Sequence, residues 1–357
     1  MIGAGDYPHL LGGSDSLSDH HDGMGQLSSP PVSARAVAEW LINSYNNSKK
    51  PLDSVALLLS EANASAFVNP KTGFTITPER ASYSNVELAV QDWADRGAEN
   101  PDNLLIFYYC GHGVSQGTGM SLLLSEYGNN KHTPFNEALD FVSFRLAMSR
   151  NSPNEQIYFI DACRSSTDTL LKSFSAGRVP VQTGRGEAAK TPIYFATLSG
   201  EDAFGKKNQV SFFTKALLNA LNGTGADNPN DEWIVTTTRL KEAIDYEVNL
   251  AFESGVKLRQ VPPTHELSTF TIHQLTSEPQ VPVIVTCSPD TENKNAQFTC
   301  AANGVVKDQR APADEHWNLT LEAGEYEFQA TLPVGIREPK KQPVQVRPIY
   351  KRVSIKV

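Results

Sequence analysis

Two residues with the chemistry of a cysteine hydrolase follow two apolar segments of this sequence. His112 stands three residues after the segment 104–109, and Cys163 stands three residues after the segment 156–160. Continuous apolar runs of this length are typical of buried parallel strands. Open α/β sheets place their chemistry at the carboxyl ends of such strands, so the two side chains are expected to meet at one edge of a sheet.

A thiol and an imidazole in contact can together cleave an amide bond. A free cysteine has a pKa of about 8.5 and is mostly protonated at neutral pH, so an imidazole that accepts its proton raises its nucleophilicity. In this scheme Cys163 attacks the carbonyl carbon, and His112 delivers a proton to the leaving amine before water hydrolyses the thioester. The chemistry is expected to need no cofactor.

The two motifs resemble those of the caspase and metacaspase clan of cysteine peptidases, peptidase family C14. The sequence Asp-Ala-Cys-Arg around Cys163 is similar to the caspase motif Gln-Ala-Cys-Arg-Gly, and His112 lies roughly 50 residues upstream, as in caspases. Asp161 stands where caspases carry glutamine and metacaspases carry aspartate. The resemblance implies a catalytic dyad of His112 and Cys163 in a prokaryotic member of the clan.

The resemblance also nominates the donors that stabilise the tetrahedral oxyanion. These are the backbone N–H groups of Gly113 and Cys163, and the missing side chain at Gly113 lets a substrate approach its amide closely. The removal of one such donor typically lowers turnover by a factor of about 10² to 10³.

Substrate selectivity is predicted from acidic residues near the nucleophile. Residues two apart in a strand share a face, so Asp161 is expected to point into the same cleft as Cys163. Metacaspases, which this motif resembles, cleave after Arg or Lys, and a carboxylate would attract such a P1 side chain. The segment 192–204 resembles the family segment beside the S1 pocket, which makes Ser199 and Asp202 further predicted S1 residues. A structural ion pair is the alternative role for Asp161.

The elements that position these residues alternate between strand-like and helix-like segments as far as about residue 275. This alternation predicts an α/β fold whose mostly parallel sheet is covered by helices on both faces, and the resemblance implies a caspase-like fold. The first strand is expected to be very short, truncated or incompletely represented. The other expected strands are 54–59, 104–109, 156–160 and 192–198, and the expected helices are 140–150, 211–222, 237–254 and two capped by Ser33 and Ser84.

The sequence pattern changes near residue 276. From 281 to 357, short alternating segments are separated by Pro, Gly, Asn and Asp turns, which favours a small all-β, Ig-like sandwich. The expected domains are therefore a caspase-like peptidase domain over 1–276 and a C-terminal β-sandwich domain over 281–357. The second domain is a candidate surface for a regulatory protein partner.

The composition indicates a cytoplasmic protein. A net charge of −9 argues against nucleic acid or an anionic membrane as a partner. No apolar run approaches the roughly 18 residues that cross a bilayer, and residues 1–6 lack the features of a signal peptide. Four cysteines in 357 residues are too few for a disulfide scaffold, so Cys110, Cys287 and Cys300 are expected to be buried core residues.

Two segments contain possible metal ligands, but no metal site is expected. Residues 19–22 are consecutive Asp and His residues, and neighbouring side chains rarely converge on one ion. The acidic segment 227–232 lacks the spaced oxygen ligands of a known calcium loop, although some metacaspases are activated by calcium.

Other functions are compatible with these motifs. The chain could be a catalytically silent caspase-like scaffold, or a cysteine amidase or acyl transferase. The presence of both His112 and Cys163 argues against the scaffold. Family analogy places the protein in a microbial stress, defence or programmed-death pathway. The loop 173–190 corresponds to the region where family members are cleaved between subunits, and its candidate self-processing sites are Lys172, Arg178, Arg185 and Lys190.

Overall fold

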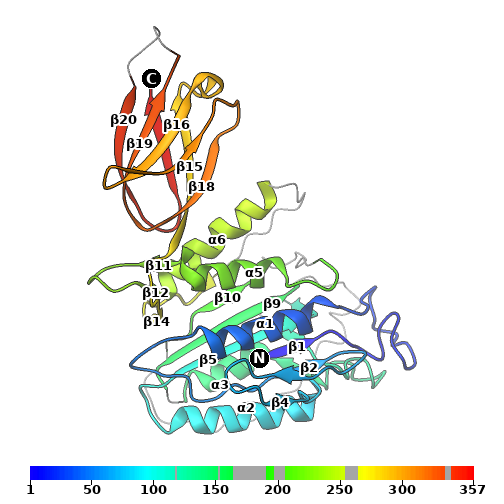
Figure 1. Cartoon of the computed structure of the whole chain (residues 1–357). Coiled ribbons are helices and arrows are strands. Elements are labelled where there is room, and N and C mark those ends of the chain that lie inside the picture. The colour runs from blue at the N-terminus through cyan, green and yellow to red at the C-terminus, as the bar shows by residue number, and fades with distance from the viewer. Residues whose placement is uncertain (117–118, 152, 164–189, 197–205, 254–263, 334–338) are drawn as a thin grey trace. The chain divides into compact units, whose positions relative to one another are not determined.

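The chain forms two compact units in a computed structural model (Figure 1). The first unit contains residues 1–218 and 244–270, and the second contains residues 219–243 and 271–357. No helix in the described parts of the chain is long and apolar enough to cross a membrane. The structure describes residues 1–116, 119–151, 153–163, 190–196, 206–253, 264–333 and 339–357.

A six-stranded sheet forms the centre of the first unit, in the order β13-β10-β9-β5-β1-β2. Its neighbouring strands are parallel except for β10 and β13, which are antiparallel at one edge. The prediction of a mostly parallel sheet is therefore confirmed. The strands are β1 (Ile2–Ala4), β2 (Leu58–Ser60), β5 (Leu104–Gly111), β9 (Glu155–Ala162), β10 (Ile193–Phe195) and β13 (Thr264–His265).

Helices cover both faces of this sheet (Figure 1). Helices α1 (Ser29–Asn43) and α5 (Phe212–Asn219) lie on one face, and α2 (Tyr83–Ala98) and α3 (Phe141–Met148) lie on the other. Aromatic side chains of α3 pack against the sheet, with the ring of Phe144 5.2 Å from the ring of Phe107. The apolar character of β5 and β9 on both faces thus follows from burial under two helical layers.

Two helices begin earlier than the sequence predicts. Helix α1 already includes Pro30 and Pro31, because proline fits the first turn of a helix, where its missing N–H has no intrahelical partner. The predicted cap, Ser33, is instead buried within α1, and its hydroxyl accepts a hydrogen bond from the N–H of Ser211. Helix α2 is capped by Ser82 rather than Ser84. The expected helices over 140–150 and 211–222 are confirmed by α3 and α5.

The first strand is short and lies inside the sheet. β1 has three residues and pairs with Tyr109 and Cys110 of β5 on one side and with β2 on the other. Gly3 is needed there because a Cβ atom would lie 2.7 Å from the carbonyl oxygen of Pro30. The glycine therefore lets α1 pack directly on the strand.

Smaller antiparallel elements surround the sheet of the first unit. Sequence reasoning did not find them, because each strand has only two to five residues. They are a hairpin of β3 (Phe67–Val68) and β4 (Thr75–Ile76) and a sheet of β6 (Gly113–Gln116), β7 (Gly119–Leu123) and β8 (Ala138–Asp140).

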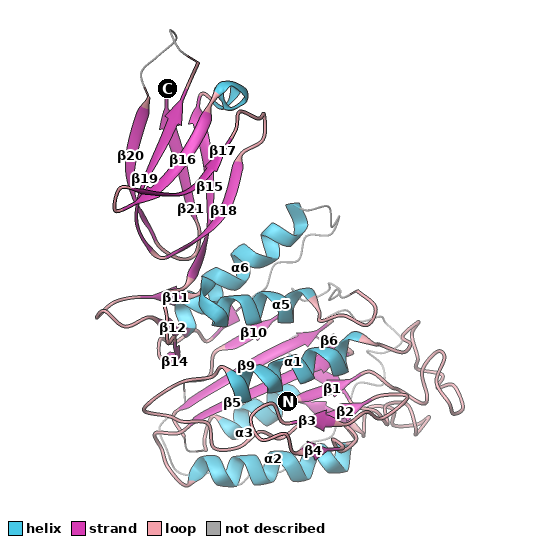
Figure 2. Cartoon of the chain, viewed as in Figure 1, coloured by secondary structure: helices cyan, strands magenta, loops and turns pink. Residues whose placement is uncertain are grey.

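The C-terminal part of the second unit is an all-β sandwich, which Figure 2 shows as strands with one short helix. Its sheets have the orders β18-β15-β21 and β17-β16-β19-β20, and their inner residues form one core that includes Phe298 and Phe328. Cys287 and Cys300 are free thiols in this core. The strands are β15 (Gln280–Ser288), β16 (Gln297–Ala302), β17 (Val305–Arg310), β18 (Trp317–Glu322), β19 (Gly324–Thr331), β20 (Lys340–Val346) and β21 (Lys351–Lys356), with the 3₁₀ helix η2 (Asp290–Asn295).

The second unit also contains segments that precede the sandwich. These are a π-helical segment, η1 (Ala220–Thr224), and an antiparallel sheet of β11 (Ala226–Asp227), β12 (Ile234–Thr236) and β14 (Thr271–Gln274). Helix α6 (Thr237–Glu253) follows β12. The predicted division into domains over 1–276 and 281–357 stays a prediction.

Candidate active site

Strands β5 and β9 bring the predicted dyad to one edge of the sheet. The two strands are parallel neighbours in which Cys110 pairs with Asp161 and Gly111 pairs with Ala162. His112 directly follows β5, and Cys163 directly follows β9. Because parallel strands end at the same edge, His112 and Cys163 both lie at the carboxyl edge of the central strands.

The backbones of the two motifs are in close approach beyond the strand ends. A Cβ atom on Gly113 would lie 2.7 Å from the carbonyl oxygen of Cys163 and 3.0 Å from the Cβ of Ala162. Such distances are too short for a real side chain, so a glycine is required at this position. Cys163 itself is partly exposed and forms no disulfide bond.

The imidazole of His112 is oriented by a backbone carbonyl. Its Nε2 lies 2.8 Å from the carbonyl oxygen of Gly25. A carbonyl only accepts hydrogen bonds, so Nε2 carries the proton, and Nδ1 of the neutral ring is the proton acceptor. Burial lowers the pKa of His112 from its usual 6.5, while the hydrogen bond to Gly25 opposes this shift. At pH 7 the ring is therefore neutral and able to act as a base.

The segment that carries Gly25 is fixed by its neighbour Gln26. The side-chain oxygen of Gln26 accepts from the N–H of Tyr7 at 2.8 Å, and its amide nitrogen donates to the carbonyl of Tyr7 at 2.8 Å. Gly25 itself bridges to Leu11. The long polar loop after β1 is thus held in place beside His112.

Asp161 lies in a buried hydrogen-bond network. Its side chain is 3% exposed, and its Oδ2 accepts from the Thr214 hydroxyl at 2.7 Å and from the Ser211 hydroxyl. Burial raises the pKa of Asp161, and hydrogen bonds from Ser211, Thr214, Cys110 and Tyr108 counteract this effect. The carboxylate is therefore surrounded by neutral donors.

These donors come from strand β5 of the central sheet and from the region of helix α5. Tyr108 and Cys110 belong to β5, and the Tyr108 hydroxyl is 2.6 Å from the Thr214 hydroxyl of α5. The alternative of a structural ion pair is not seen for Asp161 among the described residues, whose side chains offer it hydroxyl and thiol donors. The role of Asp161 in substrate selection stays a prediction.

The other predicted specificity residues lie outside the described part of the chain. Ser199 and Asp202 belong to the segment 197–205, and most of the predicted self-processing loop belongs to 164–189. Neither segment is included in the description of the site.

Sequence reasoning missed several residues that contact the dyad or Asp161. The sequence pattern places Ser211 and Thr214 only at the start of the helix predicted over 211–222, and it gives Tyr7 no role. The carbonyl of Gly25 has no sequence signal, because every residue has a carbonyl. The single available hint was the position of Ser211 and Thr214 at the amino end of a predicted helix, where hydroxyl groups often accept or donate hydrogen bonds.

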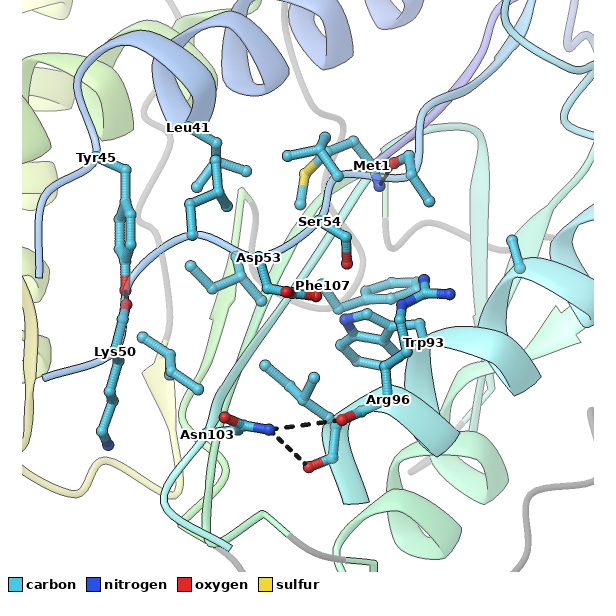
Figure 3. Close-up of a pocket in the computed structure, with 18 of the residues that line it drawn as sticks. Met1, Leu41, Tyr45, Lys50, Asp53, Ser54, Trp93, Arg96, Asn103 and Phe107 are labelled. Atoms are coloured by element: carbon cyan, nitrogen blue, oxygen red, sulfur yellow. Dashed lines mark hydrogen bonds between the residues drawn. The ribbon is translucent and has the colours of Figure 1, made fainter. Parts of the chain in front are cut away.

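A cavity beside the central sheet lies apart from the predicted dyad. It has a volume of ≈ 550 Å³, and Figure 3 shows that Leu41, Trp93, Arg96 and Phe107 line it. Its wall includes the first half of β5, from Leu104 onward, whereas His112 follows the last residue of that strand. The cavity therefore lies at the amino end of β5, away from the dyad.

The structure describes both segments that contain possible metal ligands. Among the described residues, no three His, Cys, Asp or Glu side chains are grouped to hold an ion. In the segment 19–22, Nε2 of His20 is 3.2 Å from the carbonyl of Lys131, and Nδ1 of His21 accepts from the N–H of Gly23.

Solved structures similar to this chain include a caspase. Caspase-1 from Spodoptera frugiperda aligns with a TM-score of 0.40 and 18% identity over 74% of this chain and 83% of that chain. A protein from Geobacter sulfurreducens aligns with a TM-score of 0.40 and 13% identity over 76% of this chain and 91% of that chain.

Two bacterial proteins are similar in sequence. An uncharacterized protein of Sinorhizobium fredii is 25% identical over 316 residues, which cover 82% of this chain and 90% of the relative. A probable protease of a Desulfuromonadales bacterium is 26% identical over 243 residues, which cover 64% of this chain but only 28% of the relative. The model of the caspase domain family matches residues 60–307. That match includes both motifs, and the chain belongs to the caspase domain family, peptidase family C14.

Proposed function

We propose that the protein is a cysteine endopeptidase in which His112 is the general base and Cys163 is the nucleophile. The observation that carries this proposal is the hydrogen bond from Nε2 of His112 to the carbonyl of Gly25. It leaves Nδ1 as a proton acceptor at the edge of the sheet where Cys163 lies. Membership of a peptidase family supports the same conclusion.

The reaction proceeds through a thioester. Nδ1 of His112 accepts the proton of the Cys163 thiol, and the sulfur attacks the carbonyl carbon of the scissile peptide bond. The imidazolium then protonates the leaving amine, and the C–N bond breaks. Water, deprotonated by His112, hydrolyses the thioester to release the carboxylate and restore the thiol.

The oxyanion of each tetrahedral intermediate is placed beside the N–H groups of Gly113 and Cys163. The close approach of Gly113 to the backbone of Cys163 supports this assignment, because it brings these two residues to one location. Preorganised N–H donors stabilise the developing charge without a reorganisation of solvent.

A basic P1 residue is the proposed substrate feature. Buried carboxylates are normally paired with a cation, yet the described partners of Asp161 are neutral hydroxyl and thiol groups. The guanidinium of Arg or the ammonium of Lys would supply the missing positive charge. Ser199 and Asp202 are proposed to contribute to the same pocket.

The biological setting follows from the family. We place the enzyme in the cytoplasm, in a stress, defence or programmed-death pathway, with the β-sandwich as a docking surface for a regulatory protein. These assignments rest on analogy alone.

A panel of fluorogenic peptides tests the proposed activity. Peptides with Arg, Lys, Asp or Leu at P1 would be incubated with the full chain, with Cys163→Ala and with His112→Ala, in the presence and absence of calcium. We expect turnover of the Arg and Lys peptides by the wild-type chain and none by either variant. Equal turnover by Cys163→Ala would contradict the nucleophile, and turnover of the Asp peptide alone would contradict the basic P1 preference. No turnover under any condition would favour a scaffold.

A further inference from the structure

We infer that Tyr7 and Tyr109 are positioning residues that hold the His112 base in its working orientation. The inference rests on the proposed function, since it assigns a task to residues around the proposed base. Tyr7 lies outside the two motifs, and the sequence alone gives Tyr109, in the strand segment before His112, no role in catalysis. Both are fully buried beside the carboxyl end of β5.

The two tyrosine hydroxyls bind the two peptide groups that flank the His112 side chain. The N–H of His112 donates to the Tyr7 hydroxyl at 3.0 Å. The Tyr109 hydroxyl donates to the carbonyl of His112 at 2.8 Å. The main chain of the base is therefore held on both sides of its Cα atom, which restricts the backbone rotations that would move the imidazole.

Both hydroxyls are anchored to the same neighbouring strand. The carbonyl of Leu123, at the end of β7, accepts from Tyr7 at 3.2 Å, and at 2.6 Å it shares the single Tyr109 hydroxyl proton with the carbonyl of His112. The N–H of Leu123 also donates to the carbonyl of His112 at 2.9 Å. These bonds join the base to β7 as well as to β5, so the segment after the strand is not a free loop.

The ring of Tyr7 also limits the movement of the imidazole itself. The two ring centroids are 5.0 Å apart and the ring planes are inclined by 49°. The Tyr7 ring thus packs against the imidazole, while the Gly25 carbonyl binds Nε2. The main chain of His112, the Nε2 atom and one face of the ring are therefore all held by neighbouring groups. These contacts favour the orientation of the imidazole that leaves Nδ1 available.

Gly111, which directly precedes His112, shows how closely the two hydroxyls approach the main chain. A Cβ atom on Gly111 would lie 2.5 Å from the Tyr109 hydroxyl and 2.8 Å from the Tyr7 hydroxyl. Only glycine leaves room for both hydroxyls at this position.

The tyrosines remain protonated donors throughout the reaction. Burial raises the pKa of both residues, and the negative charge of Cys163 contributes to the rise. The hydroxyls therefore lie within electrostatic reach of the nucleophile and keep their hydrogen bonds when the thiol loses its proton.

Tyrosine-to-phenylalanine variants can distinguish a positioning role of the hydroxyls from a role of the rings in core packing. Tyr7→Phe and Tyr109→Phe keep the rings and remove the hydrogen bonds to His112. Tyr158→Phe is the matched control, because Tyr158 is equally buried and its hydroxyl donates to Gln156 at 2.7 Å, within the same strand. The measurements are kcat and KM on a cleaved peptide, the rate of Cys163 alkylation by iodoacetamide as a function of pH, and the melting temperature.

We expect Tyr7→Phe and Tyr109→Phe each to lower kcat by about 10- to 100-fold with little change in KM, since small displacements of a catalytic group have effects of this size. The pH dependence of the Cys163 alkylation rate should shift toward that of His112→Ala. The alkylation rate of Cys163→Ala is the background and is subtracted first. Tyr158→Phe should lower the melting temperature only.

The inference is overturned if the two variants change the melting temperature alone, as the control does. If one variant does not fold, the other decides, because each hydroxyl binds a different peptide group of His112. Failure of the proposed function is a separate outcome: in that case His112→Ala alkylates with the same pH profile as the wild-type chain. The alkylation measurement needs no peptide substrate.

Discussion

Gly113 faces the carbonyl oxygen of Cys163 so closely that a Cβ atom would lie only 2.7 Å from it. The backbone of the segment after β5 therefore closely approaches the backbone of the segment after β9. This approach lies beside both residues of the predicted dyad, since Gly113 directly follows His112. It is also the contact that a single added methyl group would disturb most directly.

A methyl group at Gly113 should impair catalysis. In Gly113→Ala, the new Cβ would have to displace the Cys163 carbonyl, which moves the proposed oxyanion donors. We expect kcat to fall by about 10² to 10³-fold, the range found for loss of one donor. Gly324→Ala is a suitable control, because its Cβ would meet Tyr326 at an ordinary 3.6 Å. Wild-type kcat in Gly113→Ala would argue against these donors.

Activity should depend on pH through His112. The burial-lowered pKa of this imidazole lies below 6.5, so the ring is neutral above that pKa and loses its function as a base when pH falls through it. We expect kcat/KM to decrease on acidification with a midpoint below 6.5. A midpoint clearly above 6.5 would instead indicate an imidazolium paired with a thiolate. The measurement is kcat/KM between pH 5 and pH 8 in a buffer of constant ionic strength.

The neutral surroundings of Asp161 lead to a prediction about selectivity. Asp161→Asn keeps the shape of the side chain and removes the charge that a basic P1 residue would bind. We expect kcat/KM for Arg and Lys peptides to fall by about 30-fold or more, equivalent to at least 2 kcal/mol for a lost buried partner. The alkylation rate of Cys163 should not change.

A control for this variant is Asp95→Asn, an exposed carboxylate on α2. Asp95→Asn should retain the wild-type kcat/KM for Arg and Lys peptides and the wild-type rate of Cys163 alkylation. If Asp161→Asn keeps its preference for basic P1 residues, the carboxylate is a purely structural acceptor for Ser211 and Thr214.

The core of the β-sandwich should depend strongly on its aromatic residues. Phe328 is fully buried between the two sheets, and Phe328→Ala should lower the free energy of unfolding by about 3–5 kcal/mol. Val306 is 57% exposed, and Val306→Ala should change the free energy of unfolding by less than about 0.5 kcal/mol. Urea unfolding followed by circular dichroism measures both. A small effect of Phe328→Ala would mean that the sheets close over the cavity.

The central sheet was predictable because neighbouring apolar residues mark its strands in the sequence. β5 and β9 are apolar on both faces, and this continuous pattern distinguishes strands buried under two layers of helices from half-exposed ones. Helix starts were less predictable. The prolines at 30 and 31 are compatible with a loop or with a first helical turn, and only the packing of α1 on Gly3 decides between them.

Two sequence motifs predict the dyad, but they do not indicate which residues contact His112. Gly25 is 87 residues from His112, and Tyr7 is 105 residues from it, so neither contact has a local pattern. The sequence places Asp161 two residues before Cys163. Its enclosure by Ser211 and Thr214 depends on where α5 packs, which no spacing in the sequence specifies.

The order of the strands in the central sheet determines when the active site assembles during synthesis. β1 must wait for β5, because Ile2 pairs with Tyr109, and β5 in turn acquires its second neighbour only with β9. A nascent chain therefore has its base before its nucleophile. Pairings between strands so distant in sequence also slow folding. A nascent chain whose β9 is still in the ribosomal exit tunnel cannot bring Cys163 to the edge of the sheet that carries His112, so the predicted dyad is completed only when β9 pairs with β5.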